Sequence, residues 1–433
     1  MPTNDAVTAD DAARKKRDED KLLNHFEILR IIGDHQNILR MLPPTILTST
    51  ASATAEPKDQ FTGNTLVQHL KSAASNNTNE SLCRIMQGVA KALAFLHQHK
   101  IVYMDLKPDN IAITAEEEAK LMGFFSAHHV CNEKKDDGSK NPHPHSGAKR
   151  YTACEAMCCN PCTDASDVWS LACLMIWIIS GNDPWHDQKF TTNTIKEFRN
   201  VLSKGKTPSI PTQFYNHETK QKLDTVHPAL QLVMRLCLTK EHETRPTAKR
   251  VVELFGAILN ELTTTPRDGA ANKSAVLFGE IVNTLTATAD DANSILHFKA
   301  ANGNEKFQAV NQILQSGVRR IMELLLVIRY EKKNDIGAIE KLKTLTETLL
   351  TVVKNIGLLP FVLQNKDTTE LKNTIEIKMD YLTAQIQRYC ATLPPSRTAV
   401  AAPPTTFSFF SFYDDDDNTP PHEEGNSPTH SAP

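Results

Sequence analysis

Apolar residues recur at helical spacing in several separate stretches of the chain. The first begins at Lys21, and its apolar positions mostly lie three or four residues apart: Leu22, Leu23, Phe26, Leu29 and Ile32. Residues 80–98 show a strongly amphipathic helical pattern, whereas Asp164–Ser180 is apolar on nearly every side, which is typical of a buried helix. Shorter helices are predicted over residues 192–204, 228–238 and 247–262.

Short strands are predicted in two places. Residues 111–114 (IAIT) and 120–122 (KLM) follow a polar loop and predict a strand pair. The stretch from Ile38 to Lys58 predicts one or two further strands joined by a loose loop. Many helices combined with a few short strands indicate an α+β fold class.

The composition changes near residues 263–273, which contain Pro and Gly and predict a linker. Beyond it, four helical segments predict an all-α helical bundle, near residues 274–298, 304–331, 335–355 and 367–391. The two ends lack an apolar period, and we expect them to be disordered. The predicted division is therefore a disordered N-terminus at 1–20, a first folded domain at 21–262, the linker at 263–273, the bundle at 274–392, and a Pro- and Asp-rich tail at 393–433.

The charge balance narrows the range of partners. The chain has 48 Lys and Arg against 51 Asp and Glu, a net charge of -3, which argues against nucleic acid as a partner. The basic run at residues 14–17 and the four aspartates at 414–417 are interpreted as solvated ends. The longest apolar run, Leu171–Ile179, is shorter than the roughly 20 residues that span a bilayer. The N-terminus has no apolar segment typical of a signal peptide, and the nine unevenly spaced cysteines indicate reduced thiols, so we expect a cytoplasmic location.

Three polar side chains with complementary chemistry share the loop before the predicted strand pair. Asp105 can orient or deprotonate a hydroxyl, Lys107 can neutralise a phosphoryl group, and Asn110 can bind a metal ion. A carboxylate, a cation and an amide at this spacing form a set suited to phosphotransfer.

Further motifs in order strengthen this interpretation. Residues 101–113 (IVYMDLKPDNIAI) resemble the catalytic loop of the eukaryotic protein kinase family, of the Ser/Thr type. Thirteen residues after Asn110, Gly123-Phe124-Phe125 stands where the family has Asp-Phe-Gly. Residues 147–155 (GAKRYTACE) resemble the segment that ends in Ala-Pro-Glu, and residues 167–170 (DVWS) resemble the start of the buried central helix.

The resemblance covers roughly residues 21–260 and implies a protein-kinase-like fold with a truncated N-lobe and a mainly helical C-lobe, followed by the helical bundle. It implies a structural role for Asp167 at the start of the central helix. It also implies that Arg245, in Arg-Pro-Thr, pairs with the glutamate of the Ala-Pro-Glu position, here Glu155.

Several residues that handle phosphate and metal in the family are replaced. Gly123 stands at the metal-binding aspartate and has no side chain for magnesium. The first glycine of this sequence is Gly33, so no glycine-rich loop precedes the first predicted helix. Lys15, the nearest candidate for the strand lysine, is interpreted as a solvated charge. An alignment through Gly33 and His35 places His25 at the helix glutamate position, with Glu27 two residues away and facing elsewhere.

Other departures follow the same trend. Tyr103-Met104 replaces the usual His-Arg, Ala148 replaces a threonine, and Cys154 replaces the proline of Ala-Pro-Glu. The residues with structural roles remain, while most of those that hold phosphate are lost. We therefore predict a pseudokinase that acts as a signalling scaffold or allosteric partner without phosphotransfer, with Asp105, Lys107 and Asn110 as vestigial catalytic-loop positions and with no cofactor.

Two alternatives remain open. In the first, the chain is an atypical active Ser/Thr kinase that uses Asp105 as the base and requires ATP and magnesium. In the second, the helical bundle is an effector that acts on membranes or by oligomerisation and is restrained by the pseudokinase; a membrane contact would then fall within residues 274–392. The leading hypothesis instead predicts other proteins, such as a kinase or signalling partner, as the binding partners.

A cluster of cysteines and histidines suggests a zinc site. The residues concerned are Cys131, Cys154, Cys158, Cys159, Cys162, His128, His129, His143 and His145. Cys159 and Cys162 have the two-residue spacing of half a zinc knuckle, but no second half with matching spacing is present. These residues also fall where the kinase resemblance implies an ordinary activation segment, so we predict no metal site.

Overall fold

The computed structural model describes residues 4–39, 63–72, 77–130, 148–157, 162–188, 190, 194–203, 206–264, 270–295, 305–331, 335–356 and 366–393. All of them lie within one compact unit, Met1–Pro395.

Helix α1 begins much earlier than the sequence pattern predicted. It spans Asn4–Ile32, whereas we expected a helix from Lys21 and disorder over residues 1–20. The early turns have no apolar stripe, and Lys15, Lys16, Glu19 and Asp20 are exposed. Ala, Lys, Arg and Glu favour helix through intrinsic propensity alone, a signal that a search for an apolar period misses. The second half of α1 buries side chains. The helix ends at Ile32 and is followed by Gly33, whose φ of +68° is the left-handed conformation that glycine adopts readily.

The strands in the described residues form three small antiparallel sheets. The first has the order β1-β3-β4, formed by Asn64–Thr65, Ile111–Ile113 and Ala119–Leu121. The other two pair β2 (Ile101–Val102) with β5 (His128–His129), and β6 (Gln213–Tyr215) with β7 (Lys222–Thr225).

The predicted strand pair is confirmed, with Ile111 opposite Leu121 in β3 and β4. Of the strand residues expected over Ile38–Lys58, only Ile38 and Leu39 fall within the described residues. Ile38 forms a parallel bridge with Leu121, and the Leu39 N–H donates to Leu121 O at 2.9 Å.

The helices predicted after residue 79 are present with small changes at their ends. They are α3 (Asn79–Gln98), α5 (Asp164–Ser180), α6 (Ile195–Ser203), α7 (Pro228–Cys237) and α8 (Ala248–Thr264). Two short helices, α2 (Leu66–Lys71) and α4 (Cys154–Met157), and three 3-10 turns, Pro108–Asn110, Lys149–Tyr151 and His242–Thr244, were not predicted. Helix α3 starts in a capping box, in which the Thr78 hydroxyl accepts from the Ser81 N–H and the Ser81 hydroxyl accepts from the Thr78 N–H.

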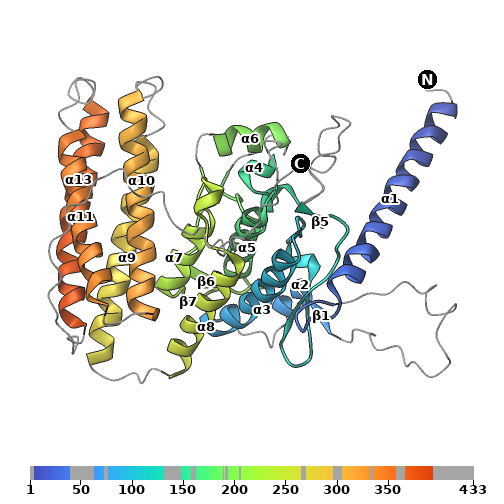
Figure 1. Ribbon diagram of the computed structural model, residues 1–433, viewed down its shortest axis with the longest axis horizontal. Coiled ribbons are helices and arrows are strands. Elements are labelled where there is room, and N and C mark those ends of the chain that lie inside the picture. Colours follow the sequence, from blue (N-terminus) through green and yellow to red (C-terminus); the bar gives the residue numbers. More distant parts are fainter. Residues whose placement is uncertain are drawn as a thin grey trace, which may run out of the picture. The chain divides into compact units, whose positions relative to one another are not determined.

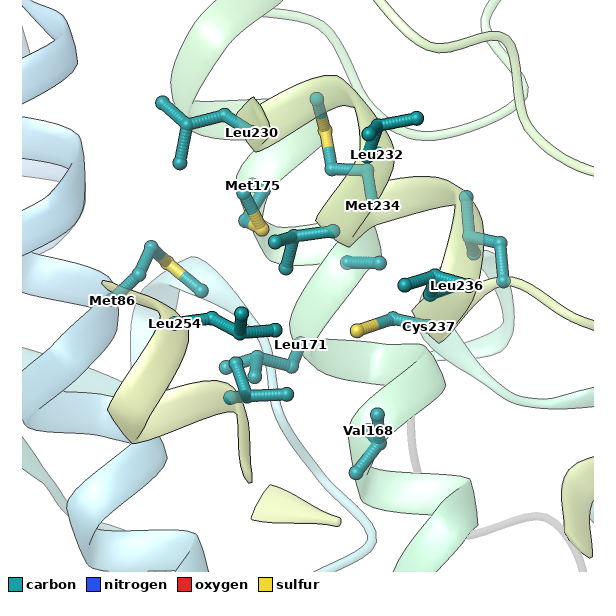
Figure 2. Close-up of a cluster of buried hydrophobic side chains, with 14 of the residues drawn as sticks. Met86, Val168, Leu171, Met175, Leu230, Leu232, Met234, Leu236, Cys237 and Leu254 are labelled. Atoms are coloured by element: carbon teal, nitrogen blue, oxygen red, sulfur yellow. The ribbon is translucent and has the colours of Figure 1, made fainter. Parts of the chain in front are cut away.

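The core of this region forms where α3, α5, α7 and α8 meet (Figure 2). Helix α5 is buried nearly all round, as its sequence predicted, and its Leu171 and Met175 are fully buried. The same buried cluster contains Met86 of α3, Met234 of α7 and Leu254 of α8 (Figure 2). The flexible methionine side chains fill irregular gaps between the helices. We call β1 to α8 the C-lobe region, because the sequence resemblance assigns most of these residues to a kinase C-lobe.

Four long helices follow, α9 (Ala270–Ile295), α10 (Glu305–Leu326), α11 (Ile336–Ile356) and α13 (Lys366–Thr392). A π-helical segment, Val327–Glu331, continues α10. Figure 1 shows the four helices side by side, with α9 and α11 both against α13 and α10. Their buried residues belong to the same hydrophobic core as those of the C-lobe region. None of the helices in the described ranges is both long and apolar enough to cross a membrane.

Candidate functional site

The loop between β2 and β3 brings together the three predicted polar residues. The Lys107 ammonium donates to Asp105 Oδ2 at 2.9 Å, and the Asn110 amide donates to the same oxygen at 2.8 Å and to the Asp105 backbone carbonyl at 2.7 Å. The turn Pro108–Asn110 positions the amide, because the Asn110 N–H closes it onto Lys107 O at 3.1 Å. The grouping predicted from the sequence is thus present as one hydrogen-bonded cluster.

The two carboxylate oxygens of Asp105 have different surroundings. Oδ2 receives both hydrogen bonds, whereas Oδ1 is buried and accepts none from the residues described. The Asp105 side chain is 12% exposed and that of Lys107 is 28% exposed. One oxygen therefore keeps the capacity to accept a proton or a hydrogen bond.

Asp167, at the start of α5, anchors the loop from beneath. Its side chain is fully buried; Oδ2 accepts from the Tyr103 N–H at 2.8 Å and contacts His97 Nε2 at 2.9 Å, and Oδ1 accepts from the Met104 N–H at 2.9 Å. These bonds hold Met104 at a φ of +68°, a conformation that an L-residue seldom adopts. Asp167 therefore fixes the backbone immediately before Asp105. Its three partners were not predicted.

Gly123 lies directly beside Asn110. Its φ is +76°, and a Cβ added there would lie 3.2 Å from Asn110 Oδ1. The neighbouring Met122 N–H donates to the Asn110 backbone carbonyl at 3.0 Å, which holds the two segments together. The position that the resemblance assigns to a metal-binding carboxylate thus faces the amide that would share the metal, but it offers no oxygen ligand from a side chain.

His25 connects helix α1 to this segment. The Phe124 N–H donates to His25 Nδ1 at 3.1 Å, and the Phe125 ring stacks on the imidazole with a centroid distance of 4.7 Å. Nδ1 therefore accepts, and in the neutral ring the proton sits on Nε2. Glu27 and Lys15 are both exposed on α1, as the sequence interpretation expected. The sequence predicted that His25 replaces the helix glutamate, but not that it contacts Phe124.

Tyr103 closes the inner side of the loop. Its hydroxyl donates to the Met122 carbonyl at 2.5 Å, and its ring meets Phe124 edge to face at 5.4 Å. Burial, with smaller contributions from the charges of Asp105 and Asp167, raises the pKa of Tyr103 well above its ordinary value. The phenol is therefore a neutral donor that ties the loop to the Gly123 segment.

The predicted pair between Glu155 and Arg245 is present and buried. Arg245 donates through Nη1 to Oε1 at 2.7 Å and through Nη2 to Oε2 at 3.0 Å, with side chains 0% and 2% exposed. The Ser166 hydroxyl donates to the same carboxylate, and the guanidinium lies 5.0 Å from the Trp169 ring centroid. Burial alone would raise the pKa of Glu155, but the hydrogen bonds and charge of Arg245 outweigh it and lower the pKa.

The rest of the activation segment is only partly described. Ala148 precedes the turn Lys149–Tyr151, and the Tyr151 hydroxyl donates to Asp183 at 3.2 Å. Cys154 begins α4, and Cys162 is buried against Val102 and Met104.

The structure describes only some of the residues proposed as zinc ligands. Cys131, Cys158, Cys159, His143 and His145 lie outside the described residues, as does Gly147 at the start of the activation-segment motif. Within the described part of the chain, no group of three or more His, Cys, Asp or Glu side chains could hold a metal ion.

Comparison with known proteins identifies relatives of one kind. The model of the protein kinase domain matches residues 7–254. A probable serine/threonine-protein kinase of Dictyostelium discoideum is 28% identical over 176 residues, which is 40% of this chain and 31% of that protein. The serine/threonine-protein kinase 17A of Oryctolagus cuniculus is 26% identical over 173 residues, 39% of this chain and 38% of that protein. The dual specificity protein kinase zak2 of D. discoideum is 34% identical over 98 residues, 22% and 15% of the two chains. The chain thus spans less than two-fifths of the length of each of these relatives.

Proposed function

Because this chain belongs to the protein kinase family, we propose that it is a pseudokinase, which acts as a signalling scaffold or allosteric partner and transfers no phosphate. Its architecture is interpreted as a kinase C-lobe with a truncated N-lobe, followed by an all-α bundle formed by α9, α10, α11 and α13. Its partners would be other proteins.

The observation that carries the proposal is Gly123. In a working kinase an aspartate there holds the magnesium ion that bridges the phosphates. Here a glycine leaves Asn110 as the nearest oxygen ligand, and its neighbour Asp105 already accepts from Lys107. One amide and one partly neutralised carboxylate form a poor donor set for magnesium, which prefers near-octahedral oxygen coordination. The residues present therefore do not fit the metal that the family uses.

His25 supports the same conclusion from the other side. The family pairs a helix glutamate with a strand lysine that grips the phosphates. At that helix position an imidazole accepts a backbone hydrogen bond from Phe124 and stacks on Phe125. A side chain already bonded to the Gly123 segment in this way does not provide the negative charge that would orient a lysine.

One observation favours the alternative of an active kinase. Asp105 and Asn110 retain a hydrogen-bonded catalytic-loop arrangement, and Asp105 Oδ1 is left without a donor among the described residues. That oxygen could accept a proton from a substrate hydroxyl. The relatives named above are also described as kinases.

A thermal-shift measurement on the full chain separates the two functions. We expect no increase in melting temperature with ATP, with or without magnesium, and no transfer of labelled phosphate to generic protein substrates. The expectation for phosphate transfer follows from Gly123, because losing one electrostatic contact to the reacting group typically lowers the rate by about 10²–10³-fold. Magnesium-dependent stabilisation by ATP, together with phosphotransfer that Asp105→Ala abolishes, would establish the active kinase instead.

A further inference from the structure

A largely buried ion pair joins the C-terminal helices to the C-lobe region. Arg329, in the π-helical segment Val327–Glu331, donates to the carboxylate of Glu261 in α8 through Nη2 and through Nε, the latter at 3.3 Å. The two side chains are 10% and 21% exposed. Burial acts against the charge of each, but the mutual hydrogen bonds and attraction outweigh it, so the pKa of Arg329 is raised and that of Glu261 is lowered. Both groups are charged at neutral pH.

Aromatic rings enclose this pair. The Arg329 guanidinium lies 4.5 Å from the ring centroid of Phe278 in α9 and 5.9 Å from that of Tyr330. Phe278 is also in contact with Tyr389 of α13, with ring centroids 6.1 Å apart. Stacking on aromatic faces stabilises a guanidinium that has lost most of its water. Residues from α8, α9, α13 and the π-helical segment therefore meet at one charge.

A second ion pair between the same two elements has the opposite polarity. Glu331 of the π-helical segment pairs with Arg250 of α8. Helix α8 thus offers a cation at Arg250 and an anion at Glu261, and the π-helical segment offers the complementary anion and cation. An exchange of partners would bring like charges together, so the pattern favours a single register between the two segments.

The π-helical geometry coincides with these contacts. A π turn is rare, and single π turns within α-helices frequently mark functional sites. Here it begins directly after Leu326, where α10 ends, and it carries both residues that pair with α8.

The contact leads from α8 toward the catalytic loop. Helix α8 packs along α3, and Gln87 of α3 donates to the Val252 carbonyl of α8 at 3.4 Å. Met86 and Leu254 meet in the same core (Figure 2). Helix α3 in turn carries His97, which contacts Asp167 beneath the loop. A displacement of α8 would therefore reach the elements that hold Asp105 in place.

We propose that the π-helical segment Val327–Glu331 is a latch, through which displacement of α10 loosens α8 and, by way of α3, the catalytic loop. The latch gives the C-terminal helices a regulatory role that goes beyond scaffolding. It does not depend on whether the domain transfers phosphate, because it rests on contacts outside the catalytic loop. Coupling between distant sites requires an element with two arrangements, and the proposed latch supplies them as an engaged and a released state.

Hydrogen–deuterium exchange on the full chain, resolved by mass spectrometry, tests the latch. In Arg329→Met we expect amide exchange in α8 and α3 to accelerate by roughly tenfold or more, because the Glu261 carboxylate loses its arginine in a largely buried site. Lys354→Met is the matched control. Lys354 pairs with Asp380 between α11 and α13, with side chains 49% and 54% exposed, and its loss should leave α8 and α3 at wild-type rates.

The reversed pair provides a second arm. Glu261→Arg combined with Arg329→Glu should exchange more slowly in α8 than either single variant, since the attraction is restored with the polarity inverted. Should Arg329→Met fail to fold, Glu261→Gln carries the same test, because it removes the charge and keeps the shape. The latch is overturned if the variant accelerates exchange only in α9 to α13, if the control changes α8 equally, or if α8 and α3 exchange as in the wild type.

Discussion

The catalytic loop has a buried side, held by Asp167, and an outward side, where Asp105 stands. Both are aspartates, yet Asp167 accepts from two backbone N–H groups and contacts an imidazole, whereas one oxygen of Asp105 accepts nothing from the described residues. The buried side is complete, with Glu155 and Arg245 paired nearby. Beside Asp105, the buried Gly123 and His25 occupy the positions that the sequence resemblance assigns to charged groups of the kinase family. The difference teaches that the buried hydrogen bonds of the loop can be complete while positions that the resemblance assigns to charged groups hold a glycine and a histidine.

The largest loss of stability should follow from removing the buried guanidinium of Arg245. Arg245→Ala leaves the Glu155 carboxylate buried without its guanidinium, and we expect a loss of roughly 3–5 kcal/mol in the free energy of unfolding, measured by chemical denaturation. Arg84→Ala is the control, because Arg84 pairs with Glu80 at the surface with side chains 53% and 48% exposed. Its effect should stay within about 0.5 kcal/mol. An Arg245 variant as stable as the wild type would contradict the buried scaffold.

An isosteric change beneath the loop should have the next largest effect. In Asp167→Asn an amide NH₂ group replaces one carboxylate oxygen. It then faces the backbone N–H of Tyr103 or of Met104, which in the wild type donates to that oxygen. We expect a loss of about 2 kcal/mol, since a buried donor loses its charged acceptor. Denaturant titration with tryptophan fluorescence measures it. A neutral result would mean that the loop does not depend on Asp167.

Acid should weaken the fold through His217, a buried histidine near the C-terminal end of α5. Burial lowers the pKa of His217 below 6.5, although its hydrogen bond to the Ile178 carbonyl acts in the opposite direction. The unfolded chain then binds more protons than the folded one, so the contribution of His217 is fully present above about pH 6.5 and is lost as the pH falls through this value toward the folded pKa. The unfolding free energy of the wild type should fall between about pH 7.5 and pH 5.5, and that of His217→Asn should fall less. Equal slopes would exclude this source of pH dependence.

The smallest effect is expected on the outward side. Asp105→Asn removes a charge whose Oδ1 is buried without a hydrogen bond, so the lost attraction to Lys107 is offset by relief of desolvation. The free energy of unfolding should change by no more than about 0.5 kcal/mol. The pair Asp105→Asn and Asp167→Asn makes the same chemical change on the two sides of one loop. If both variants lost similar amounts of unfolding free energy, the distinction between the two sides of the loop would be wrong.

The sequence predicted the elements whose apolar residues recur regularly over a long stretch. Helix α5 was expected at the residues it occupies, and α3 within one residue, because both bury most of their apolar positions. The strands β2 and β5 have two residues each, too few to show a period of two. The early start of α1 was missed because propensity rather than burial explains its first turns. The kinase resemblance, rather than periodicity, predicted that Glu155 and Arg245 would meet.

The site was predictable in its residues and only partly in its contacts. Asp105, Lys107 and Asn110 lie within six residues of one another, so a local turn brings them together. The contact between His25 and Phe124 joins positions far apart in sequence, and so do the bonds that Asp167 makes to the loop. Such contacts depend on how α1 and α5 pack against the rest of the chain, which no local pattern specifies. The ion pair of the latch could not be predicted from a local pattern either, because Arg329 and Glu261 belong to different helices.

The position of Arg245 over the Trp169 ring has an optical consequence. The chain contains three tryptophans, Trp169, Trp177 and Trp185, and all lie in the C-lobe region. Trp169 is the one whose indole lies 5.0 Å from the guanidinium that pairs with Glu155. Emission from an indole depends on nearby charge and on contact with water, so separation of the ion pair should shift this signal. The four helices after α8 contain no tryptophan and would unfold without a change in tryptophan fluorescence of their own, so tryptophan emission and circular dichroism can time the two events separately.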